Sequence, residues 1–141
     1  MNISRREIGM LLPALATVAA AQQANAALPS KVYETEAIPY TGDAKKKGRR
    51  FFQGTTHTGF HLEMHETQLG PGEISHPPHK HVNEEVIVIV EGTIDVSIEG
   101  KATRANAGSV TYFASNDLHN FKNVGTGTCR YYVLELHGDT A

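Results

Sequence analysis

The sequence predicts an all-β protein, a sandwich or barrel of short antiparallel strands, on three observations. After residue 26 no stretch keeps a helical period of apolar residues. Short alternating or continuous apolar segments recur instead, and turn signals such as Gly92 and Gly100 separate them. The chain has 141 residues and a hydrophobic content of 40%, which suffices for one core but not for two.

The first predicted strands lie before the histidine-rich stretch in the middle of the chain. A weak extended segment is expected first, over 34–40. Around residues 60–65, Phe60, Leu62 and Met64 alternate with polar residues, which is the period of a strand. If this apolar set lines the barrel, the intervening histidines face outward, and a second metal site formed by His61 and His65 is only a minor alternative. The remaining strands are predicted over 86–90, 93–99, 109–113, 119–124 and 129–136.

The apolar run over 86–90 also predicts a covered outer surface. Ile87 and Ile89 are expected to face the interior, so the three valines of the run face outward. An antiparallel strand with water on one side normally alternates apolar and polar residues. We therefore expect a second copy of the chain, or an N-terminal strand, to cover this face, and a homodimer is the prediction.

Charge and cysteine content exclude some classes of partner. The formal net charge is −2, and no basic surplus points to nucleic acid. The basic run Lys45–Arg50 is interpreted as a solvated connector, with contact to an anionic partner as the alternative. Cys129 is the single cysteine, so an intrachain disulfide is impossible. Its apolar surroundings predict a small buried side chain rather than a thiolate ligand.

The first 26 residues are predicted to be an export signal. Arg5 and Arg6 precede an apolar run over 8–21, which is shorter than the roughly 20 apolar residues that span a bilayer. Ala24 and Ala26 then supply the small residues of a cleavage site. The adjacent arginines favour a twin-arginine signal over an ordinary secretion signal. The mature protein is expected to be periplasmic or secreted, with no membrane contact after cleavage.

The organisation expected after the signal is simple. Residues 27–50 are predicted to form an extended segment and linker, and residues 51–141 one β-barrel domain. No internal repeat is evident, so one barrel is expected rather than two.

A candidate metal site follows from one cluster of residues. His79 and His81 are two residues apart, which places both imidazoles on one face of a strand, and Glu85 has the same parity. Imidazole and carboxylate suit a first-row divalent metal. Glu84 has the opposite parity and replaces Glu85 only if the turn is shorter.

A second cluster, with Gly108, His119 and Asn123, makes a resemblance recognisable. Together the clusters resemble the paired motifs of the cupin superfamily, here as a small single-domain cupin. The residues that match the first motif in type and spacing are His79, His81, Glu85 and Gly92. The glycine that begins this motif is represented by Gly72, which lies one residue farther from His79 than the motif requires. In the second motif Ala114 replaces a proline and Asn116 a glycine; asparagine tolerates the left-handed backbone that such a turn requires.

The resemblance implies a double-stranded β-helix, or jelly-roll, barrel with one metal site inside. It implies the ligands His79, His81, Glu85 and His119, pointing into the barrel. Such a site leaves one or two coordination positions open on a six-coordinate ion. Manganese or iron is expected, and nickel, copper and zinc remain possible.

The expected function is a non-haem metal-dependent enzyme, oxygenase-like, acting on a small molecule. A small-ligand binding or sensing protein without turnover, or an isomerase or lyase, is the alternative, because the fold alone does not choose. No catalytic acid or base is assigned. The candidate substrate contacts are Met64, His76, Phe113, Phe121 and Tyr132.

Overall fold

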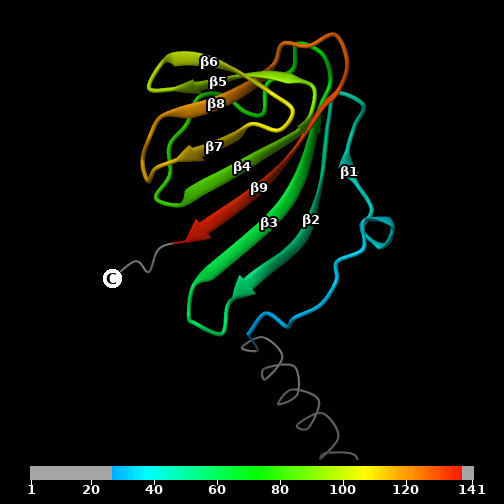
Figure 1. Cartoon of the computed structure of the whole chain (residues 1–141), viewed down its shortest axis with the longest axis vertical. Coiled ribbons are helices and arrows are strands. Elements are labelled where there is room, and N and C mark those ends of the chain that lie inside the picture. Colours follow the sequence, from blue (N-terminus) through cyan, green and yellow to red (C-terminus); the bar gives the residue numbers. More distant parts are fainter. Residues whose placement is uncertain (1–26, 138–141) are drawn as a thin grey trace, which may run out of the picture.

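Nine strands in two antiparallel sheets make up nearly all the regular structure of residues 27–137, the part of the chain that the computed structural model describes (Figure 1). The predicted export signal, residues 1–26, lies outside the described residues, as do residues 138–141. The all-β prediction is confirmed. Within 27–137, no helix has the length and apolar character needed to cross a membrane.

The larger sheet has six strands and the smaller sheet three. The larger has the order β1 (Thr41–Gly42), β2 (Lys46–Thr55), β3 (His61–Leu69), β9 (Cys129–His137), β4 (Glu84–Glu91), β7 (Val110–Phe113). The smaller has the order β6 (Lys101–Asn106), β5 (Thr93–Ile98), β8 (His119–Asn123). The extended start predicted over 34–40 instead contains a short 3-10 turn, η1 (Thr35–Ala37).

The hydrophobic core lies between the two sheets, where strands of both sheets contribute alternate side chains. Ile87 and Ile89 of β4 are buried, as predicted, while Val88 between them is 38% exposed. The smaller sheet contributes Ile94 and Val96 from β5 to the same cluster. Cys129 is buried there as a small apolar side chain, also as predicted.

The orientation of β3 is the reverse of the one expected. Glu63, Thr67 and Leu69 are buried on its inner face, so the apolar set with Leu62 and Met64 faces outward. Leu62 there shares an apolar hollow with Leu28 and other residues of the N-terminal segment. The outer face of β3 is apolar because that segment covers it, which a local pattern of residues does not reveal.

The basic run predicted as a connector is instead the first half of β2. Arg49 donates hydrogen bonds of 2.9 and 2.7 Å to Glu66 of β3, whose side chain is fully buried. Tyr40 and Gln68 also donate to this carboxylate. The charge of Arg49 is therefore used in pairing β2 with β3. The predicted domain boundary after residue 50 falls inside β2.

Two asparagines hold the loops around the barrel. The fully buried Asn123 donates from Nδ2 to three backbone oxygens, on Leu69, Gly70 and Gly127. Asn116 has a φ of 66°, which is the left-handed geometry predicted for it. Its backbone N–H donates to the His81 carbonyl at 2.7 Å, so this turn is tied to the segment that carries the first two histidines.

Candidate metal centre

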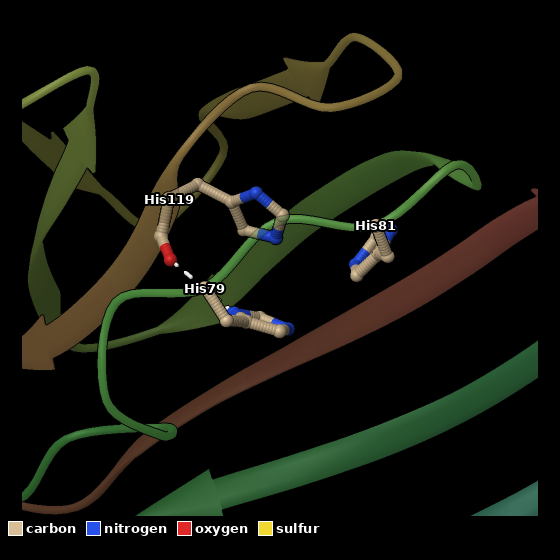
Figure 2. A group of neighbouring side chains, drawn as sticks. All are labelled: His79, His81 and His119. Carbon is tan, nitrogen blue, oxygen red and sulfur yellow. Dashed lines mark hydrogen bonds between the residues drawn. The ribbon is translucent and has the colours of Figure 1, made fainter.

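Three imidazoles from two segments distant in the sequence come together (Figure 2). His79 and His81 lie in the loop before β4, and His119 is the first residue of β8. One ring nitrogen of each lies within 4.8 Å of those of the other two. The ring centroids are separated by 4.7 to 5.1 Å. The three side chains predicted to share a site are thus neighbours.

A short backbone bridge holds the two segments in register. The N–H of His79 donates to the His119 carbonyl at 3.2 Å, and the N–H of His119 donates to the His79 carbonyl at 2.9 Å. His79 and His81 were expected on a strand, but they lie just outside β4. The bridge and the Asn116 turn therefore do the positioning that a longer strand was expected to do.

The backbone also selects the tautomer of each ring. Nδ1 lies against a carbonyl oxygen in all three: Asn83 O at 2.9 Å for His81, Asp117 O at 2.8 Å for His119 and His119 O at 3.4 Å for His79. Nδ1–H donates in each of these bonds, which leaves the Nε2 lone pair free. Metal-ligating histidines are held in this way.

Glu85 of β4 lies beside two of these three rings. It is buried on the inner face, with Oε1 at 3.1 Å from His81 Nε2 and Oε2 at 3.8 Å from His119 Nε2. Burial, together with the charge of Glu135, raises the pKa of Glu85, although His81 acts in the opposite direction. Its neighbour Glu84 is not buried with it, and Glu84 raises the pKa of the nearby Tyr112 hydroxyl.

These residues fit a divalent metal. His119 Nε2 is buried and has no hydrogen-bond partner among residues 27–137. A buried polar atom without a partner is costly, and an ion would satisfy it. Burial lowers the pKa of His119, which keeps the ring in the neutral form that binds metal. Three imidazole nitrogens and one carboxylate suit a first-row divalent ion.

A cavity of about 270 Å³ opens beside these residues. On the near side it is lined by Ser75, His76 and the candidate ligands His79, His81 and Glu85. Burial lowers the pKa of His76 to about 4, so this ring is neutral at pH 7. Its Nδ1 faces the Pro77 carbonyl at 3.2 Å, which leaves Nε2 as the acceptor.

Of the predicted substrate contacts, His76 and Phe121 line the cavity and three others do not. Phe113 is fully buried, with its ring stacked on His119 at a centroid distance of 4.2 Å. Tyr132 pairs with Glu66 and packs against Phe51, and Met64 shares its face of the sheet. Phe113 therefore supports a candidate ligand, whereas Tyr132 and Met64 are excluded because that face is outside the barrel.

The far wall of the cavity was not predicted. It is formed by residues on β2, β3 and β9, namely Lys46, His65, Thr67, Tyr131, Val133 and Glu135. Those on β3 and β9 occupy alternate positions of each strand. The alternation of inward and outward positions along each strand could therefore have identified them from the sequence. The wrong face assignment on β3 concealed it, because His65 was placed outside.

Comparisons with known proteins agree with this architecture. A sequence model described as "Cupin domain" matches residues 65–135. None of the curated proteins gives a significant match to the sequence.

Solved structures of low sequence identity share the fold. KdgF from Halomonas sp. superposes with a TM-score of 0.65 and 12% identity, covering 79% of this chain and 97% of that one. The polyketide cyclase RemF from Streptomyces resistomycificus superposes with a TM-score of 0.63 and 17% identity, covering 77% of this chain and 80% of that one. A sugar phosphate isomerase from Silicibacter pomeroyi has a TM-score of 0.62 and 14% identity, covering 77% of this chain and 76% of that one. At these identities the likeness concerns the fold.

Proposed function

Because the chain belongs to the cupin family, we propose that it holds one divalent transition-metal ion and acts on a small molecule as an oxygenase-like enzyme. The ligands would be His79, His81, His119 and Glu85. The observation that carries the proposal is the convergence of three imidazoles beside the buried Glu85 carboxylate. His79, His81 and Glu85 also line a cavity.

The chain's own residues define what the cavity accepts. A bound ion would supply Lewis acidity and open coordination positions next to the bound molecule. The volume of about 270 Å³ lies at the lower limit of small-molecule sites, which run from about 300 to 1,000 Å³, so a compact substrate fits best. His76 Nε2 offers a neutral acceptor, and Lys46 Nζ, bonded to the Ser75 carbonyl, offers a cation for an anionic group.

An isomerase or lyase that moves protons is the second candidate. His65 and Glu135 on the far wall supply groups that can accept and return a proton without dioxygen. Structures with this fold include a polyketide cyclase and a sugar phosphate isomerase, so the fold accommodates such chemistry. Export of the chain is part of the proposal and rests on the sequence of residues 1–26.

Oxygen consumption tests the proposed activity. Protein loaded with iron(II) or manganese(II) is assayed with a panel of phenolic and dicarbonyl compounds, and product formation is followed in parallel. We expect turnover of at least one compound and a loss of more than about 100-fold in His79→Ala, since the ligand is lost. Glu91→Gln, an exposed change on the same strand as Glu85, should keep the activity. Conversion without oxygen uptake would favour the isomerase or lyase, and binding without conversion would favour a sensing protein.

We also propose that the chain forms a homodimer. On the outer face of β4 and the edge strand β7, Val88, Val110 and Tyr112 are 38%, 64% and 53% exposed. An N-terminal strand or a second copy of the chain was expected to cover this face. The N-terminal segment pairs instead with β2, where Leu28 N–H donates to the Thr55 carbonyl, so we propose the second copy as the cover. Light scattering at micromolar concentration should give twice the chain mass, and Val110→Lys should lower it. A monomer mass for the unaltered protein would refute the dimer.

A further inference from the structure

Three side chains on the inner face of β3 and β9 form a second group of potential ligands. One atom from each of Glu63, His65 and Glu135 lies within 4.8 Å of the other two. None of them belongs to the centre formed by His79, His81, His119 and Glu85. We infer that this group is a second divalent-cation site, on β3 and β9 beside the first centre.

The strand register explains why these groups meet. Glu63 on β3 pairs directly with Glu135 on β9, and Glu135 pairs directly with Glu85 on β4. Residues directly opposite each other on antiparallel strands have neighbouring side chains on the same face. The sheet therefore places three carboxylates in one row across three adjacent strands.

This row is rich in negative charge. Like charges placed directly opposite on neighbouring strands destabilise a sheet. In the described part of the chain, one arginine or lysine forms an ion pair with this row. It is Arg50, whose Nε lies 3.1 Å from Glu63 Oε1, and its side chain is 60% exposed. Asn83 donates to Glu135 at 3.4 Å, but it carries no charge. A divalent cation would offset the excess negative charge, which Arg50 alone leaves in place.

Two ring nitrogens beside these carboxylates are unsatisfied. His65 Nδ1 lies 3.3 Å from Glu63 Oε1, and His137 Nε2 lies 3.5 Å from Glu135 Oε2. Both nitrogen atoms are buried, and neither makes a hydrogen bond within the part of the chain that the structure describes. Buried polar atoms normally have partners, and an ion bound between the carboxylates supplies one to His65. His137 is then positioned to orient Glu135.

The donor set indicates the class of ion. Two carboxylate oxygens and one imidazole nitrogen suit a first-row divalent ion such as manganese(II), iron(II), cobalt(II) or zinc(II). His65 and Glu135 line the same cavity as His79, His81 and Glu85 of the first centre, so a second ion there would also face a molecule bound in that cavity. The two sites use separate ligands and can be tested separately.

Cobalt binding to the purified protein tests the inference. Chelator-treated protein is dialysed against cobalt(II), and the ions bound per chain are counted by elemental analysis. We expect two ions for the unaltered protein, one for Glu135→Gln, one for Glu63→Gln, one for His79→Ala, and none when Glu135→Gln and His79→Ala are combined. His57→Ala in an exposed turn and Glu91→Gln should keep two.

The outcomes separate this inference from the proposed function. If the unaltered protein binds one ion that Glu135→Gln leaves in place and His79→Ala removes, the second site is refuted and the first stands. If Glu135→Gln removes the single ion and His79→Ala does not, the proposed function fails and the second site stands. Two ions that survive both Glu135→Gln and Glu63→Gln would also refute the second site.

Thermal stability gives a readout that a merely structural role would not produce. In chelator, Glu135→Gln should raise the Tm, because it removes the central charge of the row. With cobalt(II) present, the same variant should gain less in Tm than the unaltered protein, because one ion fewer stabilises the fold. A Glu135→Gln variant with a lower Tm in chelator and an undiminished gain with cobalt(II) would refute the inference.

Discussion

Replacing His119 with alanine should lower the affinity of the protein for a divalent transition metal by more than about 100-fold, the upper end of the loss for residues that only support a ligand. Within residues 27–137, His119 Nε2 is a buried atom without a hydrogen-bond partner, and Nδ1 is bonded to the Asp117 carbonyl, so Nε2 is available to bind an ion. The variant should also lose the stabilisation that this ion gives to the fold. That stabilisation is about 2.7 kcal/mol at an ion concentration 100 times the dissociation constant.

Competition with a metal-binding dye measures this affinity, and thermal unfolding with and without the ion measures the stabilisation. The alanine also removes the ring that stacks on Phe113, so the metal-free variant should itself be less stable. The informative quantity is therefore the difference in Tm between the metal-free and metal-loaded states. His57→Ala is the matched control. An undiminished metal-induced gain in His119→Ala would remove this residue from the site.

Arg49→Ala should lower the free energy of unfolding by about 3–5 kcal/mol, because it leaves the buried Glu66 carboxylate without its cation. Glu66 is fully buried, and the Arg49 side chain is 11% exposed. Arg49 also donates to the Thr35 carbonyl, so the change loosens the N-terminal segment as well. Urea unfolding measures the loss. Arg104→Ala is the control, because its pair with Asp95 is solvent-exposed and should contribute about 1 kcal/mol or less.

The same carboxylate gives an expected dependence of stability on pH. Burial alone would raise the pKa of Glu66, but the hydrogen bonds from Tyr40, Arg49 and Gln68, with the charge of Arg49, together lower it. A pKa lowered by folding stabilises the protein above the pKa of the unfolded state, and this contribution is lost as the pH falls through the lower folded value. Urea unfolding between pH 7 and pH 3 should show this loss in the unaltered protein. A Glu66→Gln variant with the same acid sensitivity would contradict the assignment.

Much of the fold was predictable because its strands carry local patterns. The run of β-branched residues over 86–90 and the alternation over 93–99 each became a strand with the predicted inner face. β2 was missed because a run of lysines and arginines resembles a solvated loop. Arg49 and Arg50 are instead neutralised by glutamates on the neighbouring strand, and that pairing is a tertiary contact.

The two walls of the cavity differ in how far the sequence reveals them. His79, His81, Glu85 and His119 stand at spacings that resemble a family pattern, so the sequence alone is enough to propose them. Glu63 and Glu135 are 72 positions apart along the chain by their numbers, and they become neighbours only through the register of β3 with β9. The reversed face of β3 hid His65 for the same reason, since the covering N-terminal segment decides which face is inside.

Anomalous diffraction from crystals of the protein grown with manganese(II) can locate the proposed ion directly. We expect an ion at about 2.0–2.3 Å from the Nε2 atoms of His79, His81 and His119 and from one carboxylate oxygen of Glu85. A second peak beside Glu135 would be a separate result. An anomalous map with manganese bound elsewhere and none between these four side chains would contradict the claim.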